Sequence, residues 1–419
     1  MRRTLTLFRL AARGVLREAR RSLLTASAMA LGLALLVFAR SLADGGHEDW
    51  INTGVRMGAG HVLFQAPGHR ESQSLDDRLS GRQARAALAA LAALEGPLAP
   101  LATTQRLSTR GLASSASSAL PVVIDGVDPE SESIFSQVAE RLTEGRYLEP
   151  DDRLAAYVGI GLAERLGLSL GSRFVLTAQS TGGEIQGQLV RVVGVFRTGL
   201  PEVDEGLVHI PISTARSWLK AEDAVTTVGA ILPYSKVVPE VVRAVRADIG
   251  DDDVRVLSWQ EAYPELDAAV RIDDYGSYVF HGILFAIIAL AVLNTVLMSV
   301  LHRKREFGVL QALGLTPAET GFLVFVEGLL LTTLAGVVGM IAGAAFTWGF
   351  FRNGLDFSAL MTEEFTFSGV VIDPVIIPEF RMVQVLQSFF SIAVVGITAS
   401  IFPAYQATKI DVGEALKFE

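Results

Sequence analysis

Residue types that commonly do chemistry in proteins are sparse and scattered in this chain of 419 residues. It has no cysteine, which excludes thiol chemistry, thiolate-held metals and disulfides. The six histidines form no His-x-x-x-His pair, and neither a G-x-S-x-G elbow nor a G-x-x-x-x-G-K-[ST] phosphate loop occurs. The run Asp251–Asp253 lacks the alternating ligands and glycine of a calcium loop, so we expect a solvated loop there. The sequence therefore predicts no catalytic residue, no bound cofactor and no metal site in this chain.

Two polar residues, Asn294 and Glu327, stand inside long apolar runs. A carboxylate in the hydrocarbon core of a membrane costs several kcal/mol unless it is paired or faces water. We therefore expect Glu327 to lie near the interface or beside a partner, and we favour a pairing role over a proton relay. The run that contains Glu327 also carries Gly336, Gly339 and Gly343, whose spacing is typical of a helix-packing face.

These residues belong to a chain that is 50% hydrophobic, with a mean hydropathy of +0.40. The apolar residues gather in four blocks, Ser22–Ala43, Ser277–Leu301, Gly321–Phe351 and Gln384–Ala407. Each is long enough to cross about 30 Å of hydrocarbon as a helix, and unbroken apolar runs favour helices over barrel strands. We predict four transmembrane helices. A cleavable signal peptide ending near Ala43 is the alternative for the first block, although its apolar stretch is long for one.

The distribution of charge predicts the orientation of the spans. The first 21 residues carry seven arginines and one acid, whereas Asp44–Asp274 carries 33 acids and 21 bases. Since basic residues remain on the cytoplasmic side, we expect both chain ends in the cytoplasm and the segment 44–276 outside it. Segment 302–320 then lies in the cytoplasm, and the acidic loop 352–383 lies outside. The basic segment 1–21 suits a helix on the inner membrane surface or a simple positive anchor.

The outer segment reads as a mixed α/β domain. Its glycine-bounded apolar runs predict short strands, and its amphipathic runs predict helices. The expected strands are Pro121–Ile124, Tyr157–Gly159, Arg173–Thr177, Gln188–Phe196 and Leu207–Ile210, and the expected helices are Gln83–Leu94, Gly161–Leu166, Ser213–Leu219 and Val237–Ile249. The flanks Leu42–Asp76 and Ala230–Tyr263 suggest a division into two lobes, one of them built from both ends of the segment.

The stretch Asn294–Thr320, NTVLMSVLHRKREFGVLQALGLTPAET, joins the second and third spans. It resembles the coupling segment of the FtsX/MacB superfamily of ABC transporter permeases, which reads basic-x-Arg-Glu-(Ile/Phe)-Gly-(hydrophobic)2-x-Ala-Leu-Gly. The residues that this resemblance assigns to ATPase coupling are Arg303, Lys304, Arg305, Glu306, Phe307, Gly308, Leu310, Gln311, Ala312, Leu313 and Gly314. The tail from Phe402-Pro403-Ala404 to Glu414-Ala415-Leu416 is similar to the family's C-terminal pattern, with Val412-Gly413 where a proline is usual.

Three patterns in the outer segment resemble the lipoprotein-releasing LolC/LolE-type members of this superfamily. They are the run from Ile124 to Glu130 (IDGVDPE), the run from Tyr157-Val158-Gly159 through Leu162-Ala163 and Leu166-Gly167-Leu168 to Gly171-Ser172, and the run from Val193 to Asp204. Similar patterns occur across MacB-like periplasmic domains. The resemblance therefore implies four transmembrane helices with a large MacB-like α/β periplasmic core domain between helices 1 and 2.

The resemblance also implies a mechanism and partners. Two copies of a separate cytoplasmic ATPase, which bind ATP and Mg, would drive mechanotransmission through a pair of permeases, the second being the same chain or a paralogue. This chain would then be a non-enzymatic permease of the bacterial inner membrane, in contact with lipids and not with nucleic acid. Its task would be lipoprotein release to a periplasmic carrier. The alternatives are MacB-like efflux with an adaptor and an outer-membrane channel, and FtsX-like regulation of cell-wall hydrolases without transport.

Overall fold

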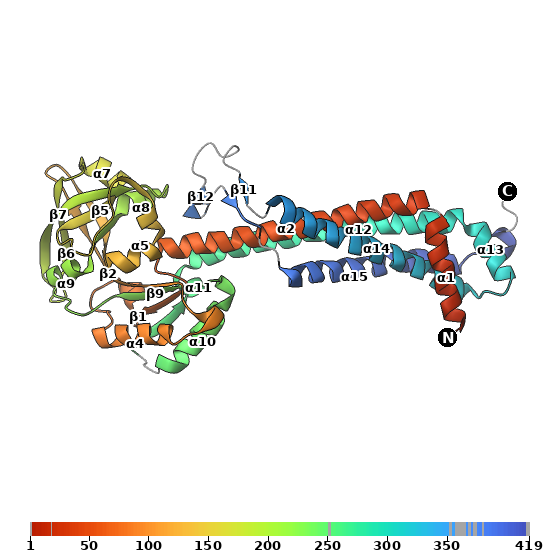
Figure 1. Cartoon of the computed structure of the whole chain (residues 1–419), viewed down its shortest axis with the longest axis horizontal. Helices are drawn as coiled ribbons and strands as arrows, with labels where there is room; N and C mark the ends of the chain where they lie inside the picture. The colour runs from red at the N-terminus through yellow and green to blue at the C-terminus, as the bar shows by residue number, and fades with distance from the viewer. Residues whose placement is uncertain are drawn as a thin grey trace. The chain divides into compact units, whose positions relative to one another are not determined.

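The computed structural model describes residues 2–17, 19–249, 253–351, 354–356, 366–367, 370–371, 375–378 and 381–415. The chain divides into two compact units, drawn in Figure 1. We call them the membrane unit (Met1–Gly46, Ile272–Phe357 and Val375–Glu419) and the α/β unit (His47–Arg271 and Ser358–Pro374).

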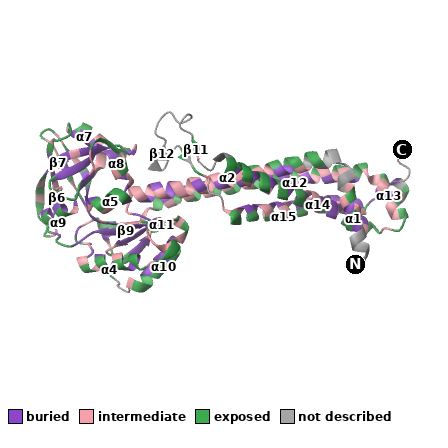
Figure 2. Ribbon diagram, in the orientation of Figure 1, coloured by how far each residue is buried: buried purple, intermediate pink, exposed green. Residues whose placement is uncertain are grey.

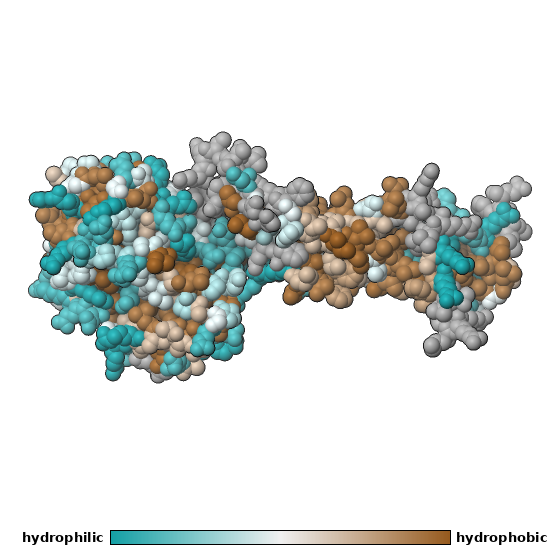
Figure 3. Space-filling view, in the orientation of Figure 1, coloured by the Kyte–Doolittle hydropathy of each residue, from teal (hydrophilic) through white to brown (hydrophobic). Residues whose placement is uncertain are grey.

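Four long helices dominate the membrane unit: α2 (Ala19–Met57), α12 (Pro264–His302), α14 (Pro317–Phe351) and α15 (Met382–Thr408). Each contains a stretch long and apolar enough to cross a membrane, and Figure 3 shows the apolar residues along these helices. The four stretches are Ala26–Met57, Pro264–His302, Pro317–Gly349 and Met382–Thr408. Their number agrees with the four predicted spans.

The ends of the first two spans differ from the limits that hydropathy suggests. α2 continues past Ala43 to Met57, through Gly45 and Gly46, and α12 begins at Pro264, well before Ser277. Hydropathy records where apolar side chains stop. The backbone hydrogen bonds of a helix continue through polar residues until a breaker intervenes, and Pro264 at the first position of α12 is such a residue.

Three shorter helices complete the described membrane unit: α1 (Arg2–Arg17), α13 (Lys304–Ala312) and α16 (Val412–Ala415). They share a buried apolar cluster with the long helices, to which α13 contributes Phe307 and α16 contributes Ala415. The strand pair β11 (Leu355–Asp356) and β14 (Val375–Ile376) also belongs to this unit. Much of the predicted loop 352–383 lies outside the described residues.

A ten-stranded sheet forms the frame of the described α/β unit. In chain order the strands are β1 (Val62–Gln65), β2 (Ala102–Ser114), β3 (Ala119–Val127), β4 (Leu142–Gly145), β5 (Ala155–Gly159), β6 (Arg173–Gln179), β7 (Ile185–Phe196), β8 (Leu207–Pro211), β9 (Thr227–Ile231) and β10 (Arg255–Ser258). The main path through the sheet is β10-β1-β9-β2-β3-β8-β5-β7-β4, while β6 pairs with both β2 and β7. A separate pair is β12 (Thr366–Phe367) and β13 (Val370–Val371).

The double pairing of β6 closes six strands into a ring, β2-β3-β8-β5-β7-β6. Alternate residues of these strands point inward, as closed sheets require. They form a core with helices α7 (Ile160–Leu166) and α9 (Ile212–Trp218) that includes Leu107, Ile124, Val158, Phe174, Leu176, Val192 and Val208. Figure 2 shows this burial along the strands.

A second core lies where β1, β9 and β10 continue the sheet from β2. Helices α4 (Gly81–Ala92) and α10 (Val238–Ile249) cover it, as Figure 1 shows. α4 begins with a capping box in which Ser80 and Gln83 satisfy each other's backbone N–H groups. One sheet runs through both cores, and the division of this unit into two lobes stays a prediction.

The remaining described elements are short. They are α3 (His69–Ser72), η1 (Gly96–Leu98), α5 (Pro129–Phe135), α6 (Gln137–Glu140), α8 (Pro201–Gly206), η2 (Ser235–Val237) and α11 (Trp259–Ala262).

The predicted strands and helices of the outer segment each coincide with an observed element, with ends shifted by a few residues. The sequence analysis does not predict β1, β2, β4, β9 or β10. Of these, β2 is the long strand that joins the ring to the rest of the sheet. Its sequence, ATTQRLSTRGLAS, has no regular alternation of apolar and polar residues, and polar side chains occupy even buried positions such as Thr104 and Arg106. Asp251 and Asp252 lie outside the described residues.

Candidate functional site

Arg303 fixes the start of the predicted coupling segment. It stands at the N-cap of α13, where its Nη1 donates to both carboxylate oxygens of Glu327 in α14, at 2.7 and 2.8 Å. Its Nε donates to Glu306 at 3.0 Å, and its guanidinium lies 5.0 Å from the ring centre of Phe307. Glu327 is 6% exposed. The intramembrane carboxylate is therefore paired, as the cost of burying it requires.

The inner face of α13 packs on α16. Phe307 is fully buried, and a Cβ on Gly308 would lie 2.7 Å from the Cβ of Ala415. Asp411 begins α16, because its Oδ1 accepts from the N–H of Gly413 at 2.7 Å and its carbonyl oxygen accepts from the N–H of Ala415 at 2.9 Å. The two patterns that carry the family resemblance in this unit thus contact each other. Leu416 lies outside the described residues.

The outer face of α13 is a stripe of Arg305, Val309 and Leu313, spaced by four residues and so aligned on the helix surface. Val309 is 42% and Leu313 78% exposed. The segment ends at Gly314, which adopts a positive φ of 103° that other residues rarely adopt. A hydrogen bond from Gln311 Nε2 to Thr320 Oγ1, at 3.2 Å, also joins the end of α13 to the start of α14.

Helix α1 covers the ion pair. A Cβ on Gly14 would collide with the Glu327 carboxylate, so the backbone of α1 comes close to it. Between α1 and α13 lies a groove of about 640 Å3, lined by Leu10, Arg13, Arg305 and Leu310 among others. The predicted basic segment at the chain start is thus part of the same site.

The other residues singled out inside the spans have different surroundings. A Cβ on Gly339 would lie 2.6 Å from the Ala30 carbonyl oxygen, and one on Gly343 would lie 2.9 Å from the Ala34 Cα. These two glycines therefore admit α2 against α14. Gly336 faces Phe389 of α15 in the same way, at 3.0 Å. Asn294 is exposed on α12, and Lys304 and Ala312 lie near the two ends of α13.

In the α/β unit, two of the three family patterns form local supports. Asp128 caps α5 by accepting from the N–H of Ser131, with Pro129 at the first helical position. Asp204, which is 7% exposed, accepts from the N–H and hydroxyl of Thr198 at 2.7 and 2.8 Å and from the N–H of Gly199 at 3.1 Å. These contacts shape the loop after β7 and give both patterns a structural role.

The remaining pattern, the run that contains Gly159 and Gly171, packs against the run that contains Asp204. Leu162, Ala163 and Leu166 are buried, and Gly167 ends α7 with a φ of 65°. A Cβ on Gly159 would collide with the backbone of Asp204, so only glycine admits this approach.

A buried charged cluster is absent from the sequence reading. Glu132 is fully buried, and it accepts from Arg106 Nη2 at 2.5 Å, Arg106 Nε at 3.3 Å and Thr104 Oγ1 at 2.5 Å. Asp125 lies 3.8 Å from Arg106 Nη1, and His209 is fully buried with its Nδ1 3.2 Å from the Tyr147 hydroxyl. Only strand pairing assembles these residues, which come from β2, β3, α5 and β8.

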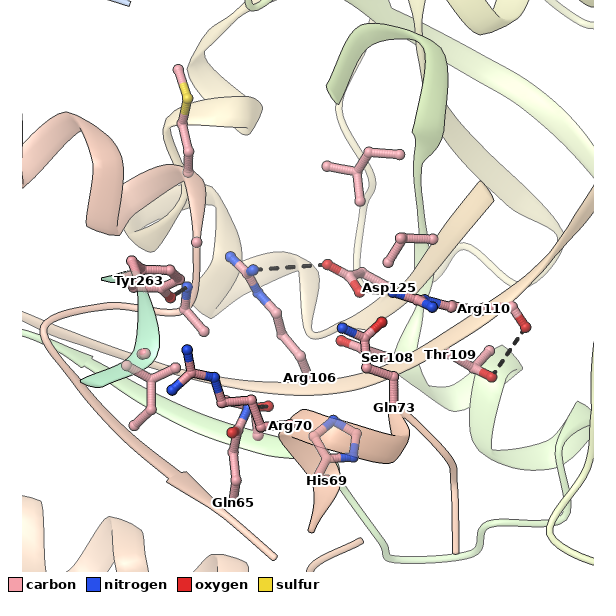
Figure 4. A pocket seen from close by; sticks show the side chains of 18 of the residues that line it. Gln65, His69, Arg70, Gln73, Arg106, Ser108, Thr109, Arg110, Asp125 and Tyr263 are labelled. Carbon is pink, nitrogen blue, oxygen red and sulfur yellow. Dashed lines mark hydrogen bonds and ion pairs between the residues drawn. The ribbon is translucent and has the colours of Figure 1, made fainter. Parts of the chain in front are cut away.

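Contacts within the cluster shift the pKa values of its members from their ordinary values. Burial opposes charge on Arg106 and Glu132, but each stabilises the other, so the pKa of Arg106 is raised and the pKa of Glu132 is lowered. Burial lowers the pKa of His209 despite Glu132 and Asp125 nearby, which keeps its imidazole neutral. Arg106 and Asp125 also line a pocket of about 440 Å3, shown in Figure 4.

Four membrane-spanning helices and a sheet-based α/β unit define an integral membrane protein with a large globular part. The family model of the MacB-like periplasmic core domain matches residues 22–269, more than half of the chain. The model of the FtsX-like permease C-terminal region matches residues 278–412. The chain belongs to the FtsX/MacB family of ABC transporter permeases. Membership implies an ATPase partner and a second permease.

Two similar proteins of known name are distant in sequence, at 23% and 24% identity. The lipoprotein-releasing system transmembrane protein LolC of Neisseria meningitidis is 23% identical over 321 residues, which cover 75% of this chain and 77% of that protein. The uncharacterized ABC transporter permease YvrN of Bacillus subtilis is 24% identical and covers 95% of this chain and 96% of its own. The extracellular domain of the transporter YknZ from Gram-positive bacteria aligns with 47% of this chain and 98% of its own, at 15% identity and a TM-score of 0.33.

Proposed function

We propose that α13 receives force from a separate cytoplasmic ATPase and passes it to the membrane helices. The observation that carries this proposal is the contrast between the two faces of the helix. Phe307 on the inner face is fully buried, whereas Leu313 on the outer stripe is 78% exposed. An exposed apolar residue on a segment that is otherwise tied down suits docking of a partner.

The ties of α13 favour transmission over bending. The Arg303–Glu327 pair joins its N-cap to α14, and close packing of Gly308 on Ala415 joins its middle to α16. A push on the outer stripe would therefore displace α14 along with α13. ATP-driven closure of an ATPase pair would supply that push, with ATP and Mg bound by the ATPase and the chemistry remaining outside this chain.

The orientation and the cargo complete the proposal. The charge distribution favours both chain ends in the cytoplasm of a bacterial cell and the α/β unit in the periplasm. The relatives named as lipoprotein-releasing proteins favour extraction of lipidated proteins from the inner membrane towards a carrier. Extraction costs about 0.8 kcal/mol for each buried CH2 group of an acyl chain, which explains a need for ATP.

Co-purification and ATPase assays test the docking step. Leu313→Asp should abolish binding of the co-expressed ATPase in gentle detergent and its stimulation by the permease. The matched control is Leu101→Asp on the α/β unit, where Leu101 is 68% exposed, and it should leave both unchanged. Full ATPase binding by Leu313→Asp would refute the role of α13.

The proteins recovered with the wild-type complex test the cargo. Triacylated proteins bound with the ATPase support lipoprotein release. An adaptor with an outer-membrane channel would instead favour export, and a regulator of a cell-wall hydrolase would favour signalling. Either result, without lipoproteins, would refute the proposed cargo and leave the docking step intact.

A further inference from the structure

The pocket of the α/β unit lies over strands β2 and β3. Arg106, Ser108 and Arg110 alternate along β2, so their side chains share one face of the sheet. On β3, Asp125 is directly opposite Ser108, and Val123 is opposite Arg110. The antiparallel register thus places one carboxylate diagonally between two cations, and all five residues line the pocket.

Asp125 is short of hydrogen-bond donors. It is 6% exposed, and its Oδ1 has no hydrogen-bond partner among the described residues. Its ion-pair contact, Oδ2 to Arg106 Nη1, is 3.8 Å long and exceeds hydrogen-bond distance (Figure 4). Two nitrogens of Arg106, Nε and Nη2, donate to Glu132, and the third, Nη1, stays 3.8 Å from Asp125. A buried carboxylate without a donor is costly, so a donor from a ligand would be strongly stabilised here.

The rim of the pocket has the opposite character. Arg110 is exposed, and its guanidinium has no hydrogen-bond or ion-pair partner within the part of the chain that the structure describes. Arg70 is a second exposed cation on the rim, and its Nη1 donates to the Glu261 carbonyl oxygen. The walls are apolar at Leu63, Val203 and Leu207. An anionic group between the two arginines would therefore be bound from the rim.

We propose that this pocket binds a zwitterion in which an ammonium group is joined by a short linker to a phosphate ester. The ammonium N–H groups donate to the Asp125 carboxylate where it lines the pocket, and the phosphate binds Arg110. The cations that line the pocket are Arg70, Arg106 and Arg110, and the carboxylates that line it are Asp125 and Glu202. The buried Glu132, which pairs with Arg106, is a third carboxylate, so the charges balance and a ligand without net charge is favoured. A free molecule and a phospholipid headgroup share this chemistry. The proposal is independent of ATPase docking at α13.

Calorimetric titration of the full chain in phosphatidylcholine nanodiscs tests the proposal. Glycerophosphoethanolamine is the probe and should bind. Glycerophosphocholine should bind at least about tenfold more weakly, because its quaternary ammonium has no N–H to donate to a charged acceptor. Lysophosphatidylethanolamine then separates the two sources. A gain of tenfold or more over the free headgroup assigns a lipid, and equal affinity assigns a soluble molecule.

Variants locate the binding site. Asp125→Asn and Arg110→Gln should each weaken binding about tenfold or more, whereas Arg173→Gln, an exposed arginine of β6 outside the pocket, should not change it. Val123→Trp fills the pocket without removing a charge and should abolish binding even if Asp125→Asn does not fold. Absence of binding to the folded wild-type chain, equal affinity for the choline compound, or unchanged affinity in folded Asp125→Asn would each overturn the proposal.

Discussion

Replacing Arg303 by glutamine should destabilise the membrane unit severely. The substitution removes the cation that lies 2.7 and 2.8 Å from the oxygens of Glu327, a carboxylate that is only 6% exposed. Removing one partner of a buried ion pair costs about 3–5 kcal/mol, whereas an exposed pair contributes about 0–1 kcal/mol. The side chain of Arg303 is 14% exposed, which places this pair near the buried limit. We therefore expect a loss of about 3 kcal/mol, a change of more than a hundredfold in the unfolding equilibrium.

The assay is reversible unfolding of the purified chain in mixed micelles by SDS titration. The matched control is Arg305→Gln, which makes the same chemical change two residues away at an exposed position and should shift the free energy by less than about 0.5 kcal/mol. The double variant Arg303→Met with Glu327→Leu should recover most of the loss, because an apolar pair of similar volume often replaces a buried ion pair without net cost. Equal effects of Arg303→Gln and Arg305→Gln would refute the reasoning, as would a double variant no more stable than the single one.

Three further predictions concern packing, a loop and pH. Gly339→Leu should lower the free energy of unfolding in the same assay by about 2 kcal/mol, because a Cβ there would lie 2.6 Å from an α2 carbonyl oxygen, whereas Gly349→Leu, with nothing within 4 Å, should change it by less than about 0.5 kcal/mol. Asp204→Ala should destabilise the α/β unit by about 2 kcal/mol or more in thermal unfolding followed by circular dichroism, since it strands three donors, and the exposed Glu202→Ala should be near neutral. Burial lowers the pKa of His61 from 6.5 to about 4, so its contribution to stability is complete above pH 6.5 and is lost as the pH falls towards 4, by on the order of 3 kcal/mol. His61→Asn should flatten the dependence of unfolding free energy on pH between those values, and an unchanged slope would contradict the assignment.

Much of the membrane unit follows from the sequence because its signals are local. Apolar runs identify the four spans, since transfer of each hydrophobic stretch into the bilayer is favourable independently of its neighbours. The run from Arg303 to Gly314 likewise indicates a short helix with a glycine stop, which α13 and the positive φ of Gly314 bear out. The need of Glu327 for a partner was also foreseeable from the cost of a buried charge.

The identity of that partner was decided by tertiary structure. Arg303 lies 24 residues from Glu327, and several basic residues were available near the end of the second span. Only the turn between α12 and α13 brings this arginine to α14. The contact of Gly308 with Ala415 has the same origin, because the two residues are distant in the chain and each is small without being otherwise distinctive.

In the α/β unit the sequence by itself predicted the strands β3, β5, β6, β7 and β8 and the helices α4, α7, α9 and α10, since alternation and turn residues act over a few positions. The tertiary structure decided the rest. β2 is too polar to be identified by alternation, yet it joins the closed ring to the remainder of the sheet. Arg106 belongs to no pattern in the sequence, and only the register of β2 on β3 brings its charge together with that of Asp125 at a pocket. Pairing between strands is a long-range choice, made by the summed packing of both cores, so no local pattern encodes it.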